Sequence, residues 1–233
     1  MLPYFYTIMS LTLCIIWVAL YFFLPQCRRS MFWTSWPFAS GGPLFEYWHR
    51  SDYWHPPYLI DFVIGNWHFG IEDYVTAFSV IGISTAIFEI LALRKGLASI
   101  PSINAKTYFR IKFWGIACIG LILIAIFAGL NSIVALFIAF ATLTILMQHR
   151  HWNIFSLAFI SAAIFTVFYW LYYFIFFELF FPSAISTYWK LGNTWGIMIT
   201  GIPIEEFIWA FLTCLFLAPV YRLCATIPIF GKY

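Results

Sequence analysis

The sequence predicts an all-α polytopic membrane protein with about seven transmembrane helices, arranged as two parallel repeats. The first observation is composition: 64% of the residues are hydrophobic, 9% are charged and the mean hydropathy is +0.90. A bundle that faces lipid accommodates so large an apolar share, whereas a soluble core does not. The second observation is a series of apolar runs of roughly twenty residues, the length that crosses a bilayer as a helix. The third is an acidic motif that occurs twice, each time at the start of an apolar run.

Several apolar runs are clear candidates for spans. In chain order they are Tyr4–Leu24, Tyr74–Leu93, Phe113–Leu130, Ile133–Met147, Phe155–Phe181 and Ile197–Arg222. We interpret the first run as a retained span and not as a signal peptide, because no basic segment precedes it and no small-residue cleavage site follows it. Asn131 and Ser132 interrupt an otherwise continuous apolar stretch, which predicts a tight turn between two helices.

The stretch Met31–Trp48 is ambiguous because Pro37, Gly41 and Gly42 disfavour a regular helix. As a short or irregular span, it brings most lysines and arginines to one face of the membrane, as the positive-inside rule favours. These residues are Arg28, Arg29, Arg94, Lys95, Lys106, Arg110, Lys112, Arg150, Arg222 and Lys232. We therefore expect an integral protein of the cytoplasmic (inner) membrane, with its N-terminus outside and its C-terminus in the cytoplasm. Irregular backbone at that depth requires a protein cover or a cavity beside it.

The acidic motif has the pattern Ile-acid-acid-aromatic-x-x-Ala-Phe and occurs at Ile71–Phe78 and again at Ile204–Phe211. Its acids are Glu72, Asp73, Glu205 and Glu206. In the expected topology both pairs enter the membrane from the outer side, which predicts one site built from both. Glu89 lies near the inner end of its span and outside that layer.

A Tyr-Trp pair precedes each acidic motif at a similar distance. The pairs are Tyr53-Trp54 and Tyr188-Trp189. This correspondence predicts two repeats, residues 1–112 and residues 113–233, related by an axis along the membrane normal.

Glu205 and Glu206 are the strongest candidates for catalytic residues, with Glu72 and Asp73 second. Carboxylates at the edge of a membrane helix are costly and mark functional sites. Two close, partly desolvated carboxyl groups do not both ionise easily, so one can donate a proton near neutral pH while its neighbour accepts one. The structural alternative is helix capping alone, because acids in a first turn complement the helix dipole.

Aromatic residues beside the acids are candidates for a substrate-binding wall. Phe207, Trp209 and Tyr74 are the nearest, and π faces stabilise a transient cation. For most of the aromatic residues in the chain, anchoring at the membrane interface is the simpler interpretation.

Several other functions lack support in the sequence. The net charge is only +3, which gives no electrostatic support for binding nucleic acid. We expect no cofactor and no metal site, because the chain has no nucleotide-binding motif and its histidines fall in predicted loops. We also expect no Ser-His pair in one site.

Residues Tyr188–Arg222 resemble the membrane lycopene cyclases of the heterodimeric or fused type, known from bacteria, archaea and fungal bifunctional proteins. The resemblance rests on the Pro-x-Glu-Glu element at Pro203–Glu206, on the two repeats and on the seven-helix size. A weaker resemblance covers Trp54–Ile90, where Gly70-Ile71 stands before the acids in place of a proline element.

The resemblance implies a carotenoid cyclase that closes a ring at the end of a linear polyene by adding and removing a proton, without redox change. It implies a catalytic set of Glu205, Glu206, Glu72 and Asp73, and it adds Trp195 and Pro203 to the substrate-binding residues. The partners would be a carotenoid or other polyene lipid and membrane lipids, and the oligomeric state, including a homo-oligomer, stays open. Two non-enzymatic alternatives remain, a transport component whose carboxylates bind an ion or a proton, and a subunit that holds carotenoid or lipid.

Overall fold

The computed structural model describes residues 2–97 and 103–226 of the chain. The helices are α1 (Phe5–Phe23), α2 (Arg28–Phe38), α3 (Gly41–Asp52), α4 (Ile71–Arg94), α5 (Ala105–Phe127), α6 (Ser132–Gln148), α7 (Trp152–Tyr173), α8 (Ala184–Tyr188), α9 (Ile204–Leu217) and α10 (Val220–Thr226). The strands are β1 (Phe62–Ile64), β2 (Trp67–Phe69), β3 (Met198–Ile199) and β4 (Ile202–Pro203). A π-helical turn, Phe174–Phe180, continues α7.

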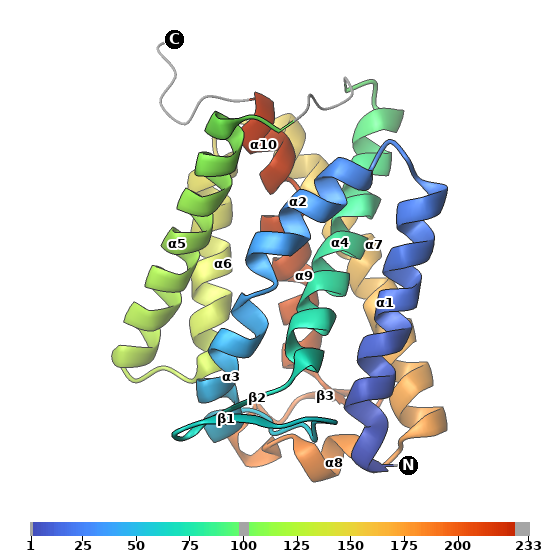
Figure 1. Cartoon of the computed structure of the whole chain (residues 1–233), viewed down its shortest axis with the longest axis vertical. Helices are drawn as coiled ribbons and strands as arrows, with labels where there is room; N and C mark the ends of the chain where they lie inside the picture. The colour runs from blue at the N-terminus through green and yellow to red at the C-terminus, as the bar shows by residue number, and fades with distance from the viewer. Residues whose placement is uncertain (1, 98–102, 227–233) are drawn as a thin grey trace.

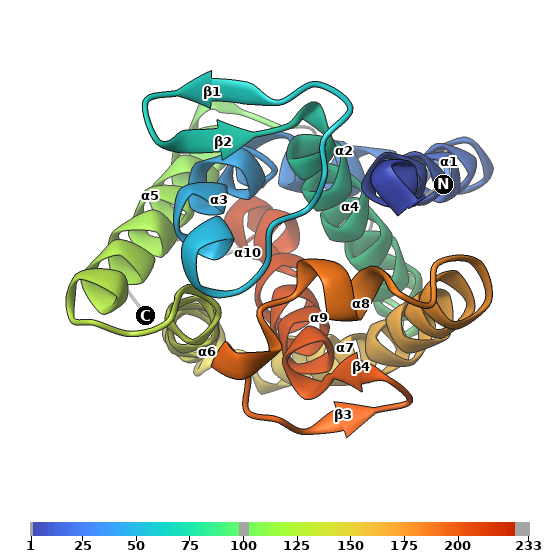
Figure 2. The same cartoon turned by 90° about the horizontal axis from the view of Figure 1, so that it is seen from below.

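The long helices form one bundle, whose axes run roughly in a common direction (Figure 1). In that view α1, α4, α6 and α9 rise from the lower end, whereas α2 with α3, α5 and α7 descend toward it. The two antiparallel hairpins, β1–β2 and β3–β4, lie at the lower end together with α8 (Figure 2). Each acidic pair stands in the first turn of its helix, α4 or α9, so both pairs lie at this same end.

Among the residues that the structure describes, five helices are long and apolar enough to cross a membrane. They are α1, α4, α5, α7 with its π-helical continuation, and α9 continued through α10. Helix α6 is apolar but has only 17 residues. The predicted all-α membrane class is therefore confirmed, whereas the seven spans, the two repeats and the orientation in the membrane stay predictions.

The basic residues used to predict the topology gather at the upper end of the bundle. Arg28 opens α2, Arg94 closes α4 and Arg222 lies in α10, all at that end (Figure 1). Lys232 lies outside the described residues.

Helices α4 and α9 are the centre of the bundle. Of their most apolar segments, 61% of the residues in α4 and 72% of those in α9–α10 are buried, against 22% in α5. Because α5 presents most of its apolar side chains outward, it is the helix most suited to face lipid.

The ambiguous segment Met31–Trp48 is a broken helix made of α2 and α3. Pro37 has no N–H to donate and disfavours continuation of an α-helix, and α2 ends one residue later. The Gly42 N–H then donates to the Ala39 carbonyl at 3.0 Å, a tighter turn than the α-helical one. The break lines a cavity, and the predicted position of this segment as an irregular span would require such a setting.

Gly42 lets α3 approach α4 closely. A Cβ atom at this position would lie 2.4 Å from the backbone oxygen of Asp73, which is far inside van der Waals contact. The first turn of α3 is thus packed directly against the acidic first turn of α4.

The two Tyr-Trp segments meet through reciprocal backbone hydrogen bonds. The His55 N–H donates to the Tyr188 carbonyl at 2.9 Å, and the Lys190 N–H donates to the Tyr53 carbonyl at 2.8 Å. Trp54 and Trp189 form the antiparallel bridge between these bonds. Segments that correspond in sequence therefore contact each other across a local two-fold relationship, which is the geometry that two parallel repeats would produce.

A buried ion pair joins the upper end of α4 to α10, the short helix that follows α9. Arg222 of α10 donates from Nη2 to Oε2 of Glu89 in α4 at 2.5 Å, and their side chains are 5% and 2% exposed. Glu89 thus lies at the end of α4 opposite the acidic pairs, as expected from the sequence.

We predict that Gly42→Ala lowers the free energy of unfolding by about 1–3 kcal/mol, because the added methyl forces α3 away from α4. The matched control is Gly41→Ala, whose new Cβ would meet only the Phe45 ring at an ordinary 3.6 Å. Thermal unfolding of both variants in detergent would measure the difference, and equal melting temperatures would contradict the close approach.

We predict that Arg222→Met destabilises the protein by about 3–5 kcal/mol, because it leaves the Glu89 carboxyl buried without its ion-pair partner. The double variant Glu89→Gln with Arg222→Met should recover much of that loss, since no charge is then left alone. Denaturant unfolding of the single and double variants would test this, and losses that simply add would show that the two residues do not interact.

Candidate active site

The candidate site is a cavity of about 170 Å³ lined by residues of α1, the α2–α3 break, α4, α5, α6, α7 and α9. Most of its lining side chains are apolar or aromatic. Three carboxyl groups also line it, those of Glu46, Asp73 and Glu206, and these residues are 2%, 3% and 6% exposed. The structure therefore places acids from α3, α4 and α9 around one largely apolar cavity.

Glu206 is held by donors from three different segments. Its Oε1 accepts the Tyr53 hydroxyl at 2.7 Å and the Trp189 indole N–H at 2.8 Å. Its Oε2 accepts a longer hydrogen bond from the Tyr169 hydroxyl at 3.4 Å, and the Tyr173 side chain also interacts with this carboxyl. None of these donors is a backbone N–H of α9, so the described contacts of this carboxyl are not those of a helix cap.

Tyr53 acts as a hydrogen-bond donor to this carboxyl. Burial, followed by the nearby Glu206 charge, raises the pKa of the Tyr53 hydroxyl well above its usual value. The phenol therefore keeps its proton at any physiological pH and always donates its hydrogen bond to the Glu206 carboxyl.

Glu205 has a different environment from its neighbour. Its Oε1 accepts the backbone N–H of Trp195 at 2.5 Å, which ties the segment before β3 to the start of α9. Among the residues that line the cavity in the described chain, Glu205 does not occur. Adjacent helical residues point about 100° apart, so the two acids of a pair face different surroundings.

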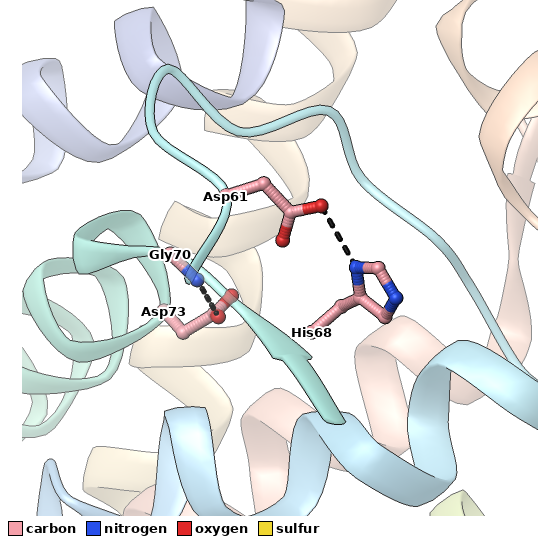
Figure 3. Close-up of polar contacts among 4 residues, drawn as sticks. All are labelled: Asp61, His68, Gly70 and Asp73. Carbon is pink, nitrogen blue, oxygen red and sulfur yellow. Dashed lines mark hydrogen bonds and ion pairs between the residues drawn. The ribbon is translucent and has the colours of Figure 1, made fainter. Parts of the chain in front are cut away.

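Asp73 both faces the cavity and caps its helix. Its Oδ2 accepts the Gly70 N–H at 2.9 Å (Figure 3), and its Oδ1 accepts the Tyr6 hydroxyl at 2.8 Å. The capping alternative considered for the acidic pairs thus describes part of what Asp73 does. Figure 3 also shows the Asp61–His68 contact of the first hairpin, at 2.8 Å, which is well exposed.

Glu72 binds the loop before its helix, as Glu205 does. Its Oε1 accepts the Leu59 backbone N–H at 2.8 Å and the Thr7 hydroxyl at 2.7 Å. In both pairs the first acid holds a preceding loop, and the second acid faces the cavity and accepts a tyrosine O–H. The pairs differ in that Asp73 also caps a helix and Glu206 does not.

On both α4 and α9, the residues that line the cavity lie on the same helix face as the second acid of the pair. On α9 the lining residues are Glu206, Trp209, Thr213 and Leu217, and on α4 they are Asp73, Thr76, Ala77, Val80 and Ile81. Spacings of three, four and seven residues define one face of a helix. Of the predicted substrate-binding residues, Trp209 lies on this face and lines the cavity.

The other predicted substrate-binding residues lie elsewhere. Phe207 is packed in the core, at 8% exposure, and Tyr74 donates its hydroxyl to the Trp36 carbonyl at the periphery. Trp195 is 52% exposed and contributes its backbone N–H to Glu205, not its ring to the cavity. Pro203 is the residue that precedes α9 and pairs with Met198 in the second hairpin.

Several polar residues of the site were not predicted from the sequence as site residues, although Tyr53 was noted there as part of a Tyr-Trp pair. They are Tyr6, Glu46, His49, Tyr53, Tyr169 and Tyr173, all of which line the cavity. The available signal was the stretch Met31–Trp48, because an acid such as Glu46 inside a short apolar segment needs a buried partner or a cavity.

The expectation that no Ser-His pair occurs in one site is wrong. His49 Nδ1 lies 2.5 Å from Ser132 Oγ, and His49 lines the cavity. The two residues are 83 positions apart, so only the packing of α3 against α6 brings them together. Within residues 2–97 and 103–226, no group of three or more His, Cys, Asp or Glu side chains is arranged to hold a metal ion.

The lycopene cyclase family model matches residues 131–224 of the chain. No curated protein and no solved structure matches it. The matched segment runs from the turn before α6 into α10 and contains Glu205, Glu206, Trp189 and Tyr169. The first acidic pair and the α2–α3 break lie outside it. The second half of the chain is therefore similar to lycopene cyclases, over the part that supplies the most completely hydrogen-bonded acid of the cavity.

Proposed function

We propose that this protein is a carotenoid cyclase of the lycopene cyclase type, which closes a ring at the end of a linear polyene within the membrane. The observation that carries the proposal is Glu206, a buried acid held by side-chain donors in a cavity with largely apolar walls. The similarity of residues 131–224 to lycopene cyclases supports the same reaction.

The reaction needs an acid, a base and a dry, electron-rich wall. A proton is added to the terminal double bond, and the resulting cation is attacked by a double bond further along the chain. A carbon–carbon bond forms and closes the ring, after which a neighbouring carbon loses a proton and a double bond is restored. The product is an isomer of the substrate, so neither an oxidant nor a reductant is consumed.

Glu206 is the proposed acid, and its two oxygens have different capacities. Oε1 accepts two short hydrogen bonds, whereas the hydrogen bond from Tyr169 to Oε2 is longer, at 3.4 Å. A protonated carboxyl has one O–H donor and keeps acceptor capacity on its other oxygen. The transferable proton therefore belongs on Oε2, and Tyr53 and Trp189 stabilise the carboxylate that remains after transfer.

Asp73 and Glu46 are the proposed partners of the acid. Both are buried in the cavity wall, and Glu46 Oε1 has no hydrogen-bond partner among the described residues. Close carboxyl groups in a low-dielectric space resist ionising together. We therefore propose that Asp73 and Glu46 share protons and that their net negative charge helps to stabilise the substrate cation. Glu205 and Glu72 are proposed to position the loops that close the site.

Aromatic rings are proposed to stabilise the cation. Trp209 and Tyr169 have ring centroids 5.6 Å apart, and Tyr169 is followed at 4.2 Å by Tyr173. All three line the cavity beside Glu206. Their π faces attract a positive charge most strongly when water is absent.

The substrate is proposed to enter from the lipid beside α5. Gly115, Cys118 and Ile122 of this helix line the cavity, and α5 is the least buried of the long helices. One helix thus separates the cavity from the membrane, which suits a polyene that partitions into lipid.

We predict that Glu206→Gln lowers the conversion of lycopene to cyclic carotenes by about 100-fold or more, because the amide cannot donate the proton. The measurement is chromatography of pigments from bacteria that accumulate lycopene and express the protein. Glu178→Gln is the control, because Glu178 is an exposed carboxylate at the end of α7 and does not line the cavity.

Equal conversion by Glu206→Gln and by the unmodified protein would remove Glu206 as the acid. If the unmodified protein is folded in the membrane and leaves lycopene unchanged, the cyclase proposal fails and the binding and transport alternatives gain support.

We predict that Tyr53→Phe lowers conversion by about ten- to a hundredfold, since one hydrogen bond to the charged form of Glu206 is worth roughly 1.5–3 kcal/mol. Tyr47→Phe is the matched control on the same helix, because Tyr47 is 45% exposed and lies away from the cavity. A Tyr53→Phe variant as active as the control would show that this bond does not support the reaction.

A further inference from the structure

A second chain of polar groups lies at the cavity wall, at the junction of α3 and α6. Ser132 donates its hydroxyl to Asp52 Oδ1 at 2.5 Å and its backbone N–H to Asp52 Oδ2 at 2.7 Å. His49 Nδ1 lies 2.5 Å from the same hydroxyl oxygen. Asp52 and His49 come from the last turn of α3, and Ser132 opens α6.

The hydrogen-bond directions in this chain define the state of the imidazole. A hydroxyl has one proton, and that of Ser132 is donated to Asp52. Ser132 Oγ can therefore only accept from His49, so Nδ1 carries the ring proton. In the neutral ring the other nitrogen, Nε2, then has a free lone pair and can act as a base.

His49 stands close to the proposed acid. It lines the same cavity as Glu206, and its ring lies 6.1 Å from the ring of Tyr53 in an edge-on arrangement. Tyr53 in turn donates to Glu206. No lysine or arginine occurs among the described residues that line the cavity. Burial lowers the pKa of His49 to about 4, so the ring is neutral before the step and can accept a proton.

We propose that His49 is the catalytic base that removes the proton released when the ring closes, and that Ser132 and Asp52 are positioning residues for it. This inference rests on the proposed function. In the step, a carbon next to the cationic centre gives up its hydrogen, and the C–H electron pair becomes the new ring double bond. The proton bonds to Nε2, and the positive charge of the imidazolium is balanced by Asp52 through Ser132.

The base also selects the product. A ring cation can lose a proton from any carbon next to the charge, and each choice gives a different position of the double bond. A base fixed at one point of the wall reaches one of these carbons. The Ser132–Asp52 pair therefore contributes to product selectivity by holding the imidazole in place.

The first experiment is His49→Ala in membranes from bacteria that accumulate lycopene, assayed with and without added imidazole. Conversion should fall about 100-fold or more, and imidazole should restore part of it, because a free base can occupy the space left by the side chain. The remaining product should contain ring isomers with a displaced double bond. His68→Ala is the control, since His68 contacts Asp61 in the outer hairpin and does not line the cavity (Figure 3).

The outcomes separate the two proposals. If His49→Ala converts lycopene as fast as the unmodified protein and gives the same ring isomer, the base assignment is overturned and the cyclase proposal stands. A reduced rate that imidazole does not change, with an unaltered product, would also overturn it. If the folded, unmodified protein does not convert lycopene, the proposed function fails and the catalytic role of His49 fails with it.

The positioning role has a spectroscopic signature that does not depend on turnover. Nitrogen NMR of protein with labelled histidine should show His49 protonated at Nδ1, and Ser132→Ala should abolish this preference. A ring protonated at Nε2 in the unmodified protein would contradict the role assigned to Ser132 and Asp52.

Discussion

The burial of two acidic pairs at one end of the bundle is the constraint around which the loops and hairpins at that end are arranged. A carboxyl group removed from water is costly unless donors surround it, and so few donors are available inside a membrane bundle that they have to come from loops and neighbouring helices. Glu72 accepts the backbone N–H of Leu59 and so fixes that loop against α4. Glu205 accepts the backbone N–H of Trp195 and so fixes that segment against α9. Glu206 gathers Tyr53 and Trp189 from the two Tyr-Trp segments, which are themselves joined by reciprocal backbone hydrogen bonds.

Within each pair, helix geometry gives the two acids different contacts. Neighbouring residues point about 100° apart, so one acid turns toward the preceding loop while the next turns toward the cavity. The division makes a doubled acid useful, because the first carboxyl closes the end of the bundle and the second stays available for chemistry. The α2–α3 break completes the space, because Gly42 allows the first turn of α3 to approach the acidic turn of α4.

The sequence predicted the features that depend on local pattern, and it missed those that depend on packing between distant segments. Apolar runs and the doubled acid motif predicted the membrane class and drew attention to Glu206. Proximity in sequence was a poor guide to the cavity wall, because Phe207 stands beside the acid in the chain but on another face of the helix, whereas Trp209 shares its face. His49 and Ser132, 83 positions apart, had no local signal, since only the contact between α3 and α6 brings them together.

The two halves of the chain contribute unequally to the site. The second half provides Glu206, the proposed acid, and it is the part similar to lycopene cyclases. The first half provides Tyr53, the broken helix and His49, whereas its own cavity-facing acid, Asp73, is partly occupied as a helix cap. Because Glu206 takes its short hydrogen bonds from both halves, neither half alone can hold the acid in place. In the proposed arrangement of two repeats, the second repeat carries the proposed proton donor, and the first carries the residues proposed to position that donor and to remove the proton.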